Sequence, residues 1–83
     1  MRVTVQLFAS LRERAGRQDW TLDVPAGCSA GDVWRTVVAA HPALTEFNAA
    51  VSCAVNAEFA SMTTEVHDGD DLAFLPPVSG GCR

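Results

Sequence analysis

The sequence contains no lysine, and its six basic residues, all arginine, face ten Asp and Glu residues. The resulting net charge of −4 argues against a nucleic-acid partner, because nucleic-acid binding needs clustered basic side chains. No hydrophobic run approaches the length of a membrane-spanning helix. Residues 2–8 alternate polar and apolar side chains, in place of a continuous apolar signal segment. We therefore expect a cytoplasmic protein that binds neither nucleic acid nor a membrane.

Cysteine and histidine are too few and too scattered for the common metal sites. Cys28, Cys53 and Cys82 form an odd number, which disfavours a closed disulfide framework. Their spacing lacks the paired Cys-x-x-Cys of zinc sites, and three thiolates cannot complete a four-thiolate iron–sulfur cluster. His41 and His67 are isolated, and no Ser/His/Asp grouping or phosphate-binding glycine loop is present. The sequence predicts no stably bound metal or cofactor, and a protein that other enzymes act upon.

Alternating apolar residues predict strands over residues 2–8, 19–24 and 51–56, and the strand-like Asp-Leu-Ala-Phe-Leu predicts a last strand over residues 71–75. The residues expected to face the core are Val3, Val5 and Leu7, then Trp20, Leu22 and Val24, then Val51, Cys53 and Val55. The first two strands are expected to pair antiparallel. Residues 9–16 are expected to be a polar connection with about one helical turn, ended by Gly16. A short fourth segment follows the turn at residues 56–59, and Gly69 suits a second turn because it tolerates positive φ.

One helix is predicted between the second and third of these strands. Ser29 and Asp32 have the spacing of a capping box, and Pro42 sets the end of the helix at about His41. Its apolar stripe consists of Val33, Trp34, Val37, Val38 and Ala40. Trp34 is expected in the core, and Leu44 and Phe47 are expected to form a short turn over one end of it. This order of elements predicts an α+β roll, a mixed sheet of four to five strands with one main helix packed across it.

The chain ends with Leu75-Pro76-Pro77-Val78-Ser79-Gly80-Gly81-Cys82-Arg83. Pro76 and Pro77 stop the last strand, because proline donates no backbone hydrogen bond. The residues beyond them are small and offer little to bury. We therefore predict a folded domain over residues 1–77 and a flexible tail over residues 78–83. Without a Cβ, the glycines allow the main chain to enter a narrow channel in a partner.

Four stretches together resemble the MoaD/ThiS family of ubiquitin-like sulfur carriers, especially its molybdopterin branch. They are residues 7–16 (Leu-Phe-Ala-Ser-Leu-Arg-Glu-Arg-Ala-Gly), 54–56 (Ala-Val-Asn), 68–75 (Asp-Gly-Asp-Asp-Leu-Ala-Phe-Leu) and 76–81 (Pro-Pro-Val-Ser-Gly-Gly). The resemblance covers residues 2–81. It implies the β-grasp fold, with the last strand in the middle of the sheet beside the first.

The resemblance also implies a mechanism and a set of partners. A MoeB-like, E1-like adenylyltransferase would use ATP to adenylate the carboxylate of Gly81, and sulfur from a persulfide donor would convert it to a thiocarboxylate. The tail would then enter a MoaE-like large subunit of molybdopterin synthase, in a heterotetramer. Pro77, Val78, Ser79 and Gly80 would be the residues recognised in the tail. Exposed apolar residues near the tail root suit a partner interface, and the candidates are Phe8, Phe74 and Leu75. The alternative, which stays open for Phe74 above all, is a place in the core.

The chain departs from the family pattern because Cys82 and Arg83 follow Gly81. The Gly81 carbonyl is then held in a peptide bond and cannot be adenylated. In one interpretation a peptidase, of the JAMM zinc type, cleaves between Gly81 and Cys82. In a second, the Cys82 thiol itself carries sulfur or takes the Gly81 acyl group as a thioester. In a third, the domain is a binding module or a ubiquitin-like modifier of other proteins. The sulfur acceptor also stays open among molybdopterin, thiamin, cysteine, a tRNA base and a specialised metabolite.

Overall fold

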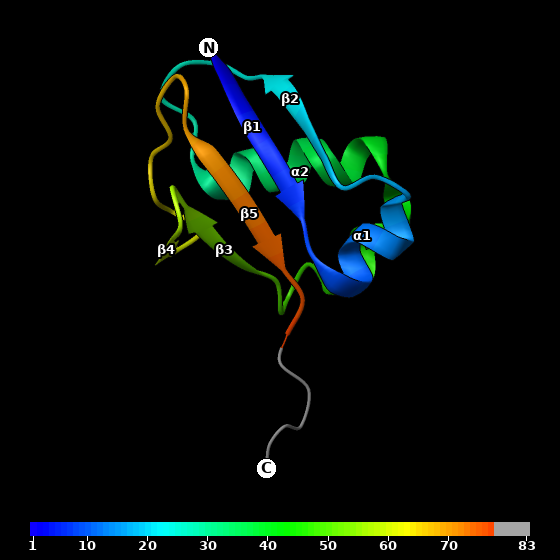
Figure 1. Ribbon diagram of the computed structural model, residues 1–83. Coiled ribbons are helices and arrows are strands. Elements are labelled where there is room, and N and C mark those ends of the chain that lie inside the picture. The colour runs from blue at the N-terminus through cyan, green and yellow to red at the C-terminus, as the bar shows by residue number, and fades with distance from the viewer. Residues whose placement is uncertain (78–83) are drawn as a thin grey trace.

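The computed structural model describes residues 1–77, which form one mixed five-stranded sheet with a helix across one face (Figure 1). The elements in chain order are β1 (Arg2–Leu7), α1 (Ala9–Ala15), β2 (Asp19–Asp23), α2 (Ala30–Ala40), the 3₁₀ helix η1 (Pro42–Phe47), β3 (Ser52–Val55), β4 (Glu58–Ala60) and β5 (Asp71–Leu75). The predicted α+β roll is confirmed. Within residues 1–77, no helix combines the length and the apolar character needed to cross a bilayer.

Strand β5 occupies the centre of the sheet, whose order is β2-β1-β5-β3-β4. It runs parallel to β1, with Leu7 opposite Phe74, and antiparallel to β3, with Ser52 opposite Leu75. Strands β1 and β2 pair antiparallel, as predicted for two strands joined by a short connection. The central position of the last strand is also confirmed. The division into a domain and a flexible tail stays a prediction, because residues 78–83 lie outside the described residues.

The core lies between the sheet and α2. Val3, Val5 and Leu7 of β1 are buried, as predicted, and α2 contributes Val33, Trp34 and Val37. The Trp34 ring lies 5.1 Å from the Phe74 ring between centroids, and its Nε1 donates a hydrogen bond of 2.8 Å to Asn48 Oδ1. Trp34 is therefore a core residue whose polar atom has a partner, as the sequence predicted.

Helix α2 begins with the predicted capping box. Ser29 Oγ accepts a hydrogen bond from the Asp32 main-chain N–H at 3.2 Å, and Asp32 Oδ2 accepts one from the Ser29 N–H at 2.9 Å. These bonds favour the charged carboxylate and lower the pKa of Asp32. The helix ends at Ala40, just before Pro42. Ala40 itself is exposed, so its place in the predicted apolar stripe is wrong; the stripe turns away from the core in the last turn.

Residues 9–15 form more structure than the sequence predicted. Instead of about one turn they make a seven-residue helix, α1, which Gly16 ends in the left-handed conformation at φ +73°. Leu11 is fully buried and holds this helix against the core. Arg14 adds an ion pair of 2.6 Å to Glu46 of η1. The helix was underestimated because a single buried leucine among polar residues gives little helical periodicity.

A two-residue turn at Asn56 and Ala57 joins β3 to β4. Both residues have positive φ, +52° and +70°, as in the mirror-image turns that suit hairpins. The Asn56 amide also reaches the start of β5: its Nδ2 donates to Asp70 Oδ1 at 3.0 Å, and its Oδ1 accepts from the Asp71 N–H at 3.0 Å. These bonds connect the hairpin to the centre of the sheet.

Asp70→Asn is expected to make the free energy of unfolding depend less on pH in acid solution. Hydrogen bonds from Asn56 Nδ2 and the His67 N–H lower the pKa of Asp70 in the folded chain. Its stabilising contribution is therefore complete above the unfolded pKa of about 3.9 and is lost as the pH falls through the lower folded pKa. Urea midpoints measured from about pH 6 to pH 2.5 should fall less steeply in the variant than in the wild type. Glu13→Gln, on exposed α1, is the control; equal slopes for all three proteins would contradict the assignment.

Candidate functional site

The root of the predicted tail is fixed by the most enclosed strand of the sheet. β5 ends at Leu75, and the described chain continues through half-buried Pro76 and exposed Pro77. The Phe8 N–H donates to the Phe74 carbonyl at 3.2 Å, and this bond connects the C-terminal end of β5 to the residue that follows β1. The C-terminal end of β5 thus lies at one end of the sheet (Figure 1). Val78, Ser79, Gly80, Gly81 and Cys82 lie outside the described residues, and their predicted roles stay predictions.

Phe74 is not part of a docking surface, which corrects the prediction from the sequence. Its side chain is 0% exposed and lies with Leu72 on the face of β5 that α2 covers. Side chains of a strand alternate between faces, so Ala73 and Leu75 lie on the opposite face, which no helix within residues 1–77 covers (Figure 1). We call this the open face. Phe8, 44% exposed, and half-buried Leu75 both line it and stay candidates for the interface.

The open face carries a groove of about 490 Å³ beside the tail root. Its floor follows the strand register, in which Ala73 lies opposite both Gln6 and Ala54. The small side chains of Ala54 and Ala73 leave space at the centre of the groove, between larger side chains at its ends. Phe8 and Leu75 line the groove near the tail root, and Phe59 lines it at the outer strand β4. An apolar hollow with aromatic walls is typical of a protein-docking surface.

Phe59 is the site residue that the sequence analysis missed. It is 79% exposed, more than Phe8, and it lies directly opposite Ala54 in the β3–β4 pair. A signal was present: a two-residue turn at Asn56 and Ala57 sets this register, and it puts Phe59 on the face opposite to buried Cys53. An exposed aromatic side chain on a short edge strand has no role in the core and is free to contact a partner.

The ThiS family model matches residues 5–81, nearly the whole chain, including both the groove and the glycine pair. The chain belongs to the ThiS family. A molybdopterin synthase sulfur carrier subunit from Arabidopsis thaliana is 37% identical over 79 residues, covering 95% of this chain and 82% of the relative. Small archaeal modifier protein 1 from Haloferax volcanii is 37% identical over 84 residues, covering 92% and 97%.

The solved structures agree with this assignment. The crystal structure of small archaeal modifier protein 1 from Haloferax volcanii superimposes with a TM-score of 0.85 at 34% identity, covering 98% of this chain and 100% of that one. The predicted β-grasp fold of ubiquitin-like proteins is therefore confirmed. The chain is a ubiquitin-like sulfur carrier of the MoaD/ThiS type.

The cysteines of the described part of this ThiS-family chain are poor candidates for sulfur chemistry. Cys53 is buried, as predicted, with its Sγ 3.3 Å from the Ala60 carbonyl oxygen, and burial raises the pKa of its thiol. Burial, with the nearby Asp32 carboxylate, also raises the pKa of Cys28. Both thiols thus stay protonated near neutral pH, and thiols react as thiolates. Of the features described here, the open-face groove and the tail root remain as the candidate site.

Proposed function

We propose that this protein is the sulfur carrier of molybdopterin synthesis, and that it acts through Gly81 after removal of Cys82 and Arg83. The observation that carries the proposal is that β5, the central strand, is followed in the sequence by Pro76, Pro77 and then Val-Ser-Gly-Gly at residues 78–81. The name of the plant relative, a subunit of molybdopterin synthase, supports this acceptor. The protein would act in the cytoplasm, where ATP is available to its activating enzyme.

The proposed chemistry needs a free carboxylate at Gly81. A terminal carboxyl group has a pKa of about 3.3–3.7 and is ionised in the cell, so it can attack the α-phosphorus of ATP with loss of pyrophosphate. The acyl-adenylate has AMP as a leaving group, which sulfur from a persulfide donor displaces. Reductive cleavage of the resulting S–S bond by a thiol leaves the thiocarboxylate. The carrier holds no cofactor of its own in this scheme, and ATP is a substrate of the E1-like, MoeB-like partner.

The open-face groove is the proposed docking surface for the MoaE-like large subunit, in a heterotetramer. Phe8 and Phe59 offer exposed aromatic area around the small floor residues. Four residues from Val78 to Gly81 span about 13–14 Å when extended, at about 3.3–3.6 Å per residue. A partner seated on the open face would therefore have the tail within reach of an active site close to this interface.

Ala73→Arg is expected to weaken binding of the large subunit at least about tenfold, since a long charged side chain would fill the floor of the groove and lose its hydration on docking. Ala73 is half-buried on the open face, so the free energy of unfolding should change little. Calorimetric titration with the large subunit measures the affinity. Ala39→Arg, at an exposed position of α2 on the other side of the sheet, is the matched control. Unchanged affinity of the Ala73 variant would place the docking surface elsewhere.

The intact mass of the protein, expressed at low level in its own host, tests the proposed function. Loss of the Cys-Arg mass is expected, followed by exchange of one oxygen for sulfur. Deletion of the candidate peptidase, of the JAMM zinc type, should leave the chain at full length and without sulfur. Sulfur at the C-terminus of a chain that still ends in Arg83 would contradict the proposal, and would favour chemistry at the Cys82 thiol.

A second function, as a protein modifier, is favoured by the similarity to small archaeal modifier protein 1. Attachment to lysines of other proteins would also need Gly81 free, so trimming does not separate the two functions. Isopeptide-linked adducts ending at Gly81 would identify the modifier. Carriers for thiamin, cysteine, tRNA thiolation or a specialised metabolite would use the same tail, and only the identity of the sulfur-labelled product distinguishes them from the molybdopterin pathway.

A further inference from the structure

The outer edge of β2 is an open strand edge on the opposite side of the sheet from Phe59. β2 pairs only with β1 in the described sheet. Met1 and Val24 exchange two main-chain hydrogen bonds, of 2.8 and 2.9 Å, and such pairs alternate along an antiparallel ladder. The Leu7 N–H donates to the Gln18 carbonyl at 2.8 Å, so Gln18 and Val24, six residues apart, both point their main-chain groups toward β1. The main-chain N–H and C=O groups of Asp19, Thr21 and Asp23 therefore point away from β1, to the outside.

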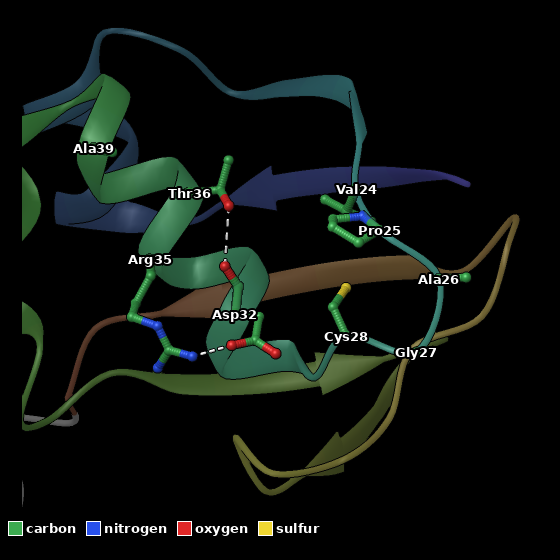
Figure 2. Close-up of a pocket in the computed structure, with 9 residues that line it drawn as sticks. All are labelled: Val24, Pro25, Ala26, Gly27, Cys28, Asp32, Arg35, Thr36 and Ala39. Carbon is green, nitrogen blue, oxygen red and sulfur yellow. Dashed lines mark hydrogen bonds and ion pairs between the residues drawn. The ribbon is translucent and has the colours of Figure 1, made fainter.

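A groove continues from the end of this edge. It has a volume of about 630 Å³ and lies between the segment that follows β2 and the outer side of α2. Figure 2 shows Val24, Pro25 and Cys28 on one side of it, and the helix residues Arg35 and Asp32 on the other. Arg35 and Asp32 are paired with each other, which leaves little net charge in the groove. Its size and apolar walls suit a side chain of a bound segment.

The charges along the edge select the kind of segment. Asp19, Thr21 and Asp23 are all exposed and alternate with half-buried Trp20 and Leu22. An antiparallel second copy of β2, paired about Thr21, would bring Asp19 opposite Asp23 twice, and like charges in such positions are destabilising. A different strand with basic side chains opposite Asp19 and Asp23 would be favourable, because opposite charges attract in such positions. The edge thus disfavours a second copy of this chain and fits a basic partner.

We propose that the open edge of β2 binds an extended segment of a partner protein, which adds a strand to the sheet and carries two basic residues four positions apart. These residues would lie opposite Asp19 and Asp23, about 13 Å apart at about 3.3 Å per residue. The residues between them alternate, so two apolar side chains would face Trp20 and Leu22. A further apolar residue, opposite Val24, would enter the groove beside α2. Main-chain pairing supplies affinity in this mode, and the side-chain pattern supplies specificity.

Strand β1 already shows this pattern on the inner side of β2. Arg2 lies opposite Asp23 and forms an ion pair with it at 3.2 Å, and Val3 and Val5 lie opposite Leu22 and Trp20. The proposed partner segment repeats that arrangement on the outer side. It is separate from the open-face groove and does not depend on the sulfur chemistry, so a partner bound here leaves the tail root free.

Titration of the ¹⁵N-labelled full-length chain with the peptide acetyl-Leu-Arg-Val-Thr-Val-Arg-amide tests the proposal. Amide shifts are expected at Asp19, Thr21 and Asp23 and around Ala26 and Ala39. Thr21→Pro removes one outward N–H without touching the β1 ladder, and should weaken binding by roughly tenfold. Thr21→Ala keeps the N–H and is the matched control. A peptide with glutamate in place of both arginines should not bind.

Asp19→Arg provides a second variant that does not change the main chain. It should lower the affinity for the arginine peptide and raise the affinity for the glutamate peptide. The proposal is overturned if the arginine peptide causes no shifts at millimolar concentration, or if its shifts lie at Phe8 and Leu75 on the open face. Equal affinity of the Thr21→Pro and Thr21→Ala variants would also overturn it, as would dimerisation of the free chain through Thr21.

Discussion

A chain that ends at Gly81 is expected to support ATP–pyrophosphate exchange by the proposed adenylyltransferase, whereas the 83-residue chain should give only background exchange. The reason is chemical: with Cys82 attached, the Gly81 carbonyl belongs to an amide and has no carboxylate oxygen to attack ATP. Removing two residues should therefore raise pyrophosphate exchange from background to a clearly measurable rate. Exchange of labelled pyrophosphate into ATP, with both chains at equal concentration, measures this directly.

Two further chains make this comparison decisive. A chain ending at Gly80 has a free carboxylate that is one residue, or about 3.3–3.6 Å, short of the full reach, and it should give little exchange. A full-length chain with Cys82→Ser should stay inactive until it is trimmed. Exchange by the untrimmed wild-type chain that is lost in Cys82→Ser would contradict the trimming step and identify the Cys82 thiol as the reacting group.

Phe74→Ala is expected to lower the free energy of unfolding by about 3–5 kcal/mol, the usual cost of emptying a large buried aromatic position. Phe74 is 0% exposed and its ring packs 5.1 Å from Trp34, so the cavity would open at the centre of the core. A domain of this size has a total stability of about 4–12 kcal/mol, at about 0.05–0.15 kcal/mol per residue. The variant should therefore lose a large share of the total stability, with a urea midpoint well below that of the wild type. Urea denaturation followed by tryptophan fluorescence measures the change.

Phe59→Ala is the matched control for this substitution. The same side chain is removed from a position that is 79% exposed, so the free energy of unfolding should change by less than about 0.5 kcal/mol. Phe59→Ala should nevertheless weaken binding of the large subunit, because it removes exposed aromatic surface from the groove while the chain stays fully folded. A stable Phe74→Ala variant that no longer binds the partner would restore Phe74 to the docking surface.

Much of the fold was predictable from local patterns in the sequence. Ser29 and Asp32 defined the start of α2 and Pro42 its end. The apolar stretch between the turn at Gly69 and Pro76 predicted β5 with the bounds that the structure shows. These predictions succeeded because caps, prolines and two-residue periods act over a few residues. The central place of β5 came from the family resemblance, because strand order depends on contacts between distant residues.

The site was less predictable, for an identifiable reason. Phe74 and Leu75 were grouped by their closeness to the tail, although neighbouring residues of a strand face opposite sides. Buried Leu72 would have placed Phe74 in the core. Phe59 was missed because its exposure depends on the hairpin register, which positive φ at Asn56 and Ala57 sets. The floor at Ala54 and Ala73 is a hollow only because three strands meet there, which no local pattern encodes.

The central position of β5 also affects how the protein is made. The ribosome synthesises β5 after every other described element, yet β5 is the strand that joins the β1–β2 pair to the β3–β4 pair. Until residues 71–75 emerge, the growing chain can form only two separate strand pairs and no continuous sheet. Pairing of β1 with β5 closes a loop of more than 60 residues, so folding waits for a contact of high sequence separation. An incomplete chain therefore has neither a finished open face nor a fixed tail root, and the proposed activating enzyme would find its docking surface only on carriers that have folded.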